Sequence, residues 1–97
     1  METSDRPTRT DRHMTRDLEG ELLLYDAADG EIYVLNDTAR QICLSCDGRH
    51  SVDDLVHEIV STFDVDEATA RTDVEGTLER LMKLGVIALN PAQPPPA

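Results

Sequence analysis

Two cysteines and two histidines are the residues whose types and spacing most readily suggest chemistry. Cys43 and Cys46 form a C-x-x-C motif, and His50 and His57 follow it. Two thiolates with two imidazoles complete a tetrahedral zinc site. However, the cysteines fall on the apolar face of a predicted helix, whereas His57 falls on the polar face of the next. We therefore interpret both cysteines as core residues and expect no metal and no other cofactor, with a small zinc protein as the alternative.

The other titratable side chains show no catalytic arrangement. His13, His50 and His57 have no plausible nucleophile beside them, so neither a Ser-His nor a Cys-His pair is indicated. The carboxylates are scattered over polar helix faces, and the glycines are isolated rather than grouped in a phosphate-binding loop. We expect that the chain is not an enzyme.

Composition excludes several classes of partner. The 97 residues carry 9 Lys and Arg against 20 Asp and Glu, a formal net charge of -11. A nucleic-acid binder needs clustered basic residues, and a membrane-spanning helix needs about 18 consecutive apolar ones. We therefore expect no nucleic acid and no membrane as partners. The N-terminus has no apolar export signal, so we also expect a cytoplasmic protein with reduced thiols.

Charge and apolar content divide the chain into three parts. Residues 1–16 have a net charge of +1 and almost no apolar residue, which predicts a mobile N-terminal tail. Residues 17–89 contain the apolar patterns and form the expected domain. Residues 90–97 are rich in proline and predict a disordered tail. From residue 17 onward the net charge is -12.

The domain is predicted to combine a small sheet with three helices. Residues 21–25 and 31–35 are short apolar runs joined by a turn containing Asp29-Gly30, as in an antiparallel hairpin, and residues 12–16 are a weaker third strand. Helical spacing predicts helices from Asn36 or Asp37 to about Cys46, from Ser51 to Phe63, and from about Glu67 to Leu84. An extended segment over 86–89 closes the core. The expected class is α+β: an N-terminal antiparallel sheet of two or three strands followed by three helices, resembling a winged helix.

The second strand of the hairpin offers the clearest functional signal. In residues 32–35 both faces are apolar, so one face is not simply solvated. A short strand with an open edge beside an amphipathic helix is a template for a peptide that adds as a further strand. Alternatively, the N-terminal segment covers that edge, and composition alone does not decide between the two.

Three ordered motifs resemble those of PqqD-like proteins. Leu35-Asn36-Asp37-Thr38-Ala39 is similar to the Leu-Asn-x-Thr-Ala that opens their first helix, and Cys46-Asp47-Gly48 is similar to their Cys-Asp-Gly turn. Asp73-Val74, Leu78, Leu81 and Gly85-Val86-Ile87 resemble the end of the family pattern. The resemblance extends from about Leu22 to Ile87 and leaves out both tails. Within this range, Cys43 is not one of the residues that match the family motifs.

This resemblance implies a peptide chaperone, a leader-recognition element in the maturation of ribosomally made peptides. Such a protein binds the leader of a precursor peptide by strand addition and presents it to a modifying enzyme. In pyrroloquinoline quinone biosynthesis that enzyme is a radical SAM protein. The alternative is an acidic winged-helix-like adaptor that acts in regulation through protein contacts. The identity of the precursor, its product and the enzyme stay open, and so does the choice between a monomer and a strand-exchanged dimer.

Carried onto this sequence, the resemblance places the peptide between the hairpin and the third helix. The peptide-binding residues expected from the strand are Ile32, Tyr33, Val34 and Leu35. Those expected from the helix are Arg71, Glu75, Leu78, Glu79 and Met82, with Leu78 and Met82 as the floors of side-chain pockets. The acidic domain favours a leader with basic residues and a salt-sensitive association.

Overall fold

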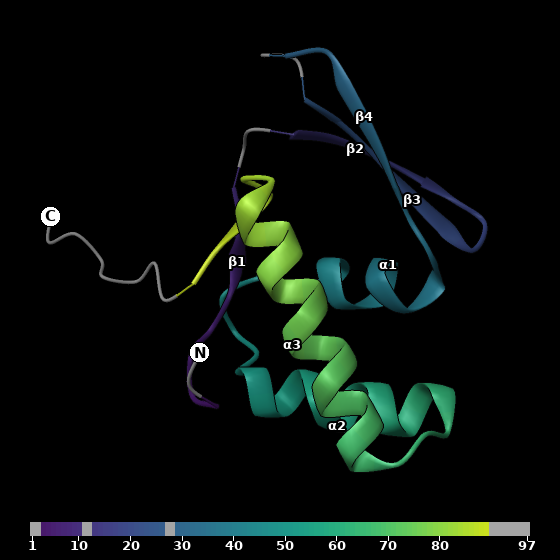
Figure 1. Ribbon diagram of the computed structural model, residues 1–97, viewed down its shortest axis with the longest axis vertical. Coiled ribbons are helices and arrows are strands. Elements are labelled where there is room, and N and C mark those ends of the chain that lie inside the picture. The colour runs from purple at the N-terminus through teal and green to yellow at the C-terminus, as the bar shows by residue number, and fades with distance from the viewer. Residues whose placement is uncertain (1–2, 11–12, 27–28, 90–97) are drawn as a thin grey trace, which may run out of the picture.

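The computed structural model describes residues 3–10, 13–26 and 29–89. Five strands and three helices are found in these residues, in the order β1(Thr8–Arg9), β2(His13–Leu18), β3(Glu21–Asp26), β4(Glu31–Leu35), α1(Asp37–Leu44), α2(Val52–Phe63), α3(Glu67–Lys83), β5(Ile87–Ala88). Figure 1 shows the sheet of β2, β3 and β4 at one end, with α1 between this sheet and α2 and with α3 crossing both helices. The predicted α+β architecture is confirmed.

The larger sheet is antiparallel with strand order β2-β3-β4. Its register pairs Leu22 with Leu35 and Leu24 with Tyr33 across the predicted hairpin. Because successive side chains alternate between the two faces of a strand, Leu22, Leu24 and Leu35 all point to one face, where each is at most 1% exposed. That face packs on α1, and the register therefore determines which face of β4 is buried.

The helix starts follow the capping residues of the sequence. The Asn36 side chain accepts a hydrogen bond from the Ala39 N–H at 3.0 Å and so caps α1. At α2, Ser51 and Asp54 form a reciprocal capping box, because each side chain accepts from the other residue's backbone N–H at 3.0 Å. Such caps satisfy backbone donors that the helix itself leaves without partners.

One core joins the sheet to the three helices. The aliphatic stripes of the three helices pack on one another, and α1 joins this core to the inner face of the sheet. The buried apolar residues are Leu22, Leu24, Leu35, Ala39, Ile42, Cys43, Cys46, Val52, Leu55, Val56, Ile59, Ala70, Val74, Leu78, Leu81, Val86 and Ile87. This set fixes the position of α3 relative to β4, on which the candidate site depends.

Backbone pairing involves residues that precede the predicted domain boundary at Asp17. β1 pairs with β5, and the carbonyls of Thr3 and Asp5 accept hydrogen bonds from the first N–H groups of α2. Gly48 has a φ of 82°, and a Cβ at this position would lie 2.8 Å from the Thr8 hydroxyl oxygen. The Cys-Asp-Gly turn therefore uses glycine because β1 passes directly over it.

The described residues of the N-terminal segment do not pair with β4. Residues 13–18 pair with β3 at the opposite edge of the sheet, and residues 8–9 pair with β5 in a separate sheet. The proline-rich segment 90–97, expected as a disordered tail, lies outside the described residues. Within the described chain, no helix has the length and apolar content needed to cross a membrane.

Candidate peptide-binding groove

A groove lies between the end of β4, the start of α1 and one side of α3. It encloses about 270 Å³. Its lining residues are Val34, Asn36, Thr38, Ala39, Asp73, Thr77 and Arg80. Within the described residues, β4 is hydrogen-bonded to β3 along one edge and to no strand along the other. The groove thus borders an open strand edge, whose outward N–H and C=O groups can pair with another chain.

The α3 wall of the groove is polar and carries charges of both signs. Asp73, Thr77 and Arg80 are spaced so that they share one side of the helix. Thr77 is half-buried, whereas Asp73 and Arg80 are exposed. Neither charged side chain forms an ion pair within the described residues. A carboxylate and a guanidinium on one wall can therefore each bind an opposite charge of a ligand.

The four residues predicted from β4 divide between its two faces. Ile32 and Val34 are 58% and 50% exposed and lie on the outer face. Tyr33 is half-buried and packs against the core, and Leu35 is 1% exposed within it. Of these four residues Val34 lines the groove, whereas Leu35 positions the strand from the core.

The five residues predicted from α3 lie outside the lining of this groove. Leu78 lies in the core, and Met82 is half-buried against it. Arg71 donates to Asp53 of α2 at 2.9 Å and to Glu67 at 3.1 Å. Glu75 is half-buried and Glu79 is exposed. None of the five lines the groove, so their role in peptide binding stays a prediction.

Helical geometry explains this difference. The buried stripe of α3 consists of Ala70, Val74, Leu78 and Leu81. At 100° per residue, Arg71, Glu75, Glu79 and Met82 fall on one flank of that stripe, and Asp73, Thr77 and Arg80 fall on the other. The ion pair from Arg71 to Asp53 shows that the first flank faces α2. Periodicity reveals both flanks but does not say which one faces β4, and that is why the sequence did not point to the groove residues.

Both cysteines are fully buried and free. The Cys46 thiol donates a hydrogen bond to the Ile42 carbonyl at 3.1 Å. Its pKa is raised to about 12, mainly by burial and to a smaller extent by the neighbouring Cys43. Burial also raises the pKa of Cys43. Thiols held in this protonated state are poor nucleophiles and poor metal ligands.

The histidines after the motif pair with aspartates instead. His50 Nδ1 lies 3.0 Å from Asp47 Oδ1, and this contact raises the pKa of His50. His57 Nε2 lies 3.9 Å from Asp53 Oδ2. Among the residues that the structure describes, no group of three His, Cys, Asp or Glu side chains is arranged to hold a metal ion.

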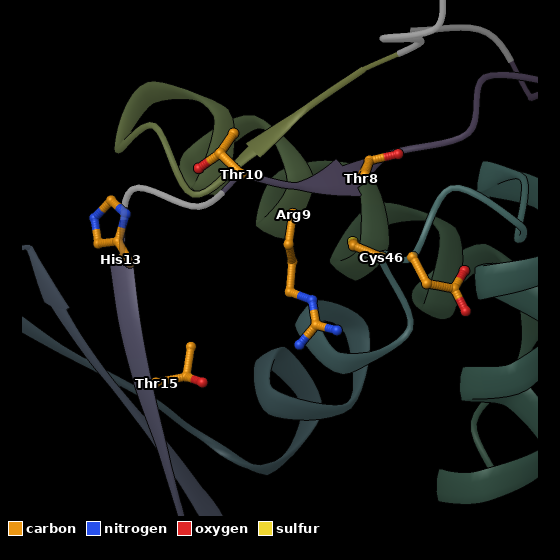
Figure 2. Close-up of a pocket in the computed structure, with 7 residues that line it drawn as sticks. Thr8, Arg9, Thr10, His13, Thr15 and Cys46 are labelled. Carbon is orange, nitrogen blue, oxygen red and sulfur yellow. The ribbon is translucent and has the colours of Figure 1, made fainter.

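A second cavity, of about 430 Å³, lies where β1 meets β2. Figure 2 shows the Arg9 side chain extending from β1 toward α1, with His13 and Thr15 on β2 across the cavity. The His13 side chain is 2% exposed, and its Nε2 lies 3.6 Å from Asp26 Oδ2. Because β2 and β4 are opposite edges of the sheet, this cavity is separate from the groove.

Comparison with known proteins identifies the fold and the family. Two solved structures share the fold: "TbiB1 in Complex with the TbiA(beta) Leader Peptide", with a TM-score of 0.74 and 18% identity over 82% of this chain and 93% of that one; and "Lasso peptide synthetase B1 complexed with the leader peptide", with a TM-score of 0.75 and 23% identity over 86% and 98%. The comparison with curated proteins gives no match. The family model described as Coenzyme PQQ synthesis protein D (PqqD) matches residues 21–87, and the chain therefore belongs to the PqqD family.

Proposed function

We propose that this protein captures the leader of a ribosomally made precursor peptide by strand addition and presents it to a modifying enzyme, of the radical SAM type, without catalysing the modification itself. The observation that carries the proposal is the open edge of β4 beside the groove along α3. Membership of the PqqD family and a fold shared with two proteins solved with leader peptides support it.

Backbone pairing supplies the sequence-tolerant part of the binding. β4 contains five residues, and alternate residues of an edge strand direct their N–H and C=O groups outward. Each hydrogen bond to an added strand contributes roughly 0.5–1.5 kcal/mol net. A handful of such bonds with modest side-chain contacts corresponds to reversible capture, which suits a protein that passes its peptide to another.

Side chains along the groove supply selectivity. Val34 offers an apolar contact on the strand side, and Thr77 lies opposite it on α3. Arg80 and Asp73 lie one turn of helix to either side of Thr77, so a leader with a carboxylate and a basic residue at matching spacing is favoured. The strongly acidic domain adds a general preference for basic leaders, which weakens as salt screens it.

The test is a titration with fluorescein-labelled peptides that cover the leaders of candidate short precursors encoded in the same genome. We expect saturable binding by fluorescence polarisation, weaker at 300 mM than at 50 mM salt because of screening (~0.05–0.3 M spans Debye lengths of roughly 14 to 6 Å). Hydrogen exchange should slow at amides of Ile32–Leu35 when the peptide binds, while exchange within α2 stays unchanged. Absence of binding at every salt concentration would refute the proposal.

A further inference from the structure

The large apolar side chains that the described chain exposes all lie on one face of the sheet. These side chains are Met14, Leu18, Tyr25, Ile32 and Val34, with exposures of 66%, 39%, 39%, 58% and 50%. The register aligns Met14 with Tyr25 and Tyr25 with Ile32, so three of them form a continuous row across the strands. We call this set of five residues the outer face.

The outer face is the side of the sheet away from the helices (Figure 1). The inner face presents Leu22, Leu24 and Leu35 to the core, and alternation along each strand places the outer residues opposite them. A hollow of about 440 Å³ opens beside Met14, Leu23 and Tyr25. An apolar row with an adjoining hollow has the shape of an interaction surface for an apolar anchor.

The charge around the outer face selects the kind of partner. Glu19 and Glu21 are exposed at one hairpin turn, and Asp29 and Glu31 are exposed at the other. Arg16 is the basic residue within the face, between Met14 and Leu18. Acidic side chains at both ends fit a partner whose apolar patch has a basic rim. A second copy fits poorly, because each copy carries a net charge of -11 and the two would repel.

The outer face is also continuous with the peptide groove. Val34 lines the groove and is half exposed on the outer face, so one strand belongs to both surfaces. A peptide strand added beside β4 would extend the sheet, and its alternate side chains would continue the outer face. A protein that lies on this face therefore contacts the sheet and the bound peptide together.

We propose that the outer face is the docking surface for the peptide-modifying enzyme, and that the enzyme recognises the sheet and the added peptide strand as one surface. This inference rests on the proposed function. Its consequence is coupling: the leader tightens the complex with the enzyme, and by linkage the enzyme tightens the complex with the leader by the same factor.

The experiment compares wild-type protein with the double variant Met14→Ser/Tyr25→Ser. Both residues lie on β2 and β3, away from the open edge of β4, and both are exposed, so the fold and the groove are retained. The conservative variant Tyr25→Phe keeps the ring and serves as the matched control. The probes are the leader peptide that the titration identifies and the candidate radical SAM enzymes of the same genome.

We expect the double variant to bind the leader within about twofold of wild type but to bind the enzyme at least tenfold more weakly, since buried aromatic anchors dominate such interfaces. The Tyr25→Phe variant should bind both as wild type does. Wild type should bind the enzyme more tightly when the leader is present. Unchanged enzyme binding by the double variant, or no binding of the enzyme by wild type that holds the leader, would overturn the docking surface.

Two other outcomes separate the possible failures. If wild type does not bind the leader at all, the proposed function fails, whatever the enzyme does. If sedimentation of wild type alone shows a dimer that the double variant converts to a monomer, the outer face binds a second copy and the docking of the enzyme is refuted.

Discussion

Replacing Thr77 by tryptophan should weaken capture of the leader. Thr77 lies in the middle of the α3 wall of a groove of about 270 Å³ and is half-buried there. An indole at this position fills the space that a peptide strand needs beside β4. Threonine and tryptophan have similar helix propensities, so α3 itself should persist.

The magnitude follows from the hydrogen bonds that the displaced peptide loses. A residue held beside an edge strand makes about two backbone hydrogen bonds, each contributing roughly 0.5–1.5 kcal/mol. Displacing one such residue from β4 therefore costs about 1–3 kcal/mol, which corresponds to roughly a 5- to 150-fold rise in Kd. Stability should change little, because substitutions at positions with open space beside them usually stay within about 0.5 kcal/mol.

Fluorescence polarisation with the labelled leader measures the change in Kd, and thermal unfolding monitors the fold. The matched control is Thr72→Trp, the same substitution on the same helix at an exposed position outside the groove. Thr72 should tolerate tryptophan with unchanged affinity. If Thr77→Trp binds the leader as tightly as wild type, or if the control weakens binding equally, the groove is not the peptide site.

Three further predictions concern stability and reactivity. Gly76→Ala should raise the free energy of unfolding by up to about 1 kcal/mol, seen as a higher Tm. Gly76 lies in the interior of α3, where alanine is the better helix former, and a Cβ at this position has no atom within 4 Å apart from its chain neighbours and the backbone of its own helix. A lower Tm would contradict this reasoning. With its pKa at about 12, Cys46 is thiolate in only about one molecule in 10⁴ at pH 8. Ellman's reagent should therefore react with Cys43 and Cys46 only after denaturant is added, and rapid native labelling would refute their burial. The hydrogen bond from the Ser51 N–H lowers the pKa of Asp54 in the folded protein. The ionised Asp54 side chain therefore stabilises the fold above about pH 4, and this stabilisation is lost as the pH falls through the folded-state pKa. Asp54→Ala should reduce the acid dependence of Tm, and an unchanged dependence would exclude that role for the capping box.

Local signals in the sequence predicted most of the fold. The turn before Gly30, the cap at Asn36 and the capping box at Ser51 each mark an element boundary that the structure reproduces within a residue or two. These signals are reliable because each satisfies backbone groups or a positive φ within a few residues. Their energetics do not depend on distant parts of the chain.

Of the two N-terminal strands, β2 was expected as a weak strand over residues 12–16, whereas β1 could not be predicted from the sequence. β1 is two residues long and β2 exposes most of its side chains, so neither has an apolar period. Backbone pairing holds both: β1 with β5 near the C-terminus, and β2 with β3. A pairing between residues 8 and 88 leaves no trace in local composition, and a polar segment therefore looked like a tail.

The α3 residues that line the groove differ from those predicted to bind the peptide, for a related reason. The apolar stripe of α3, which includes Val74, Leu78 and Leu81, follows from the helical spacing of these residues in the sequence. Which flank of α3 faces β4 depends instead on where α2 and the sheet pack. Arg71, which is predicted to bind the peptide, donates a hydrogen bond to Asp53 of α2. One-dimensional periodicity gives the buried direction of a helix, whereas its lateral neighbours are a property of the three-dimensional arrangement.

The two proposed surfaces meet at one strand, and this arrangement determines which substitutions can separate them. β4 supplies Leu35 to the core, its open edge to the groove, and Ile32 to the outer face. A change at Val34 touches both surfaces, so it should weaken peptide and enzyme binding together. Thr77 lies only in the groove and Met14 only on the outer face, so variants at these two positions should lose one interaction each. If the peptide strand completes the surface that the enzyme binds, Thr77→Trp should also abolish the leader-dependent gain in enzyme affinity while leaving the leader-independent part intact.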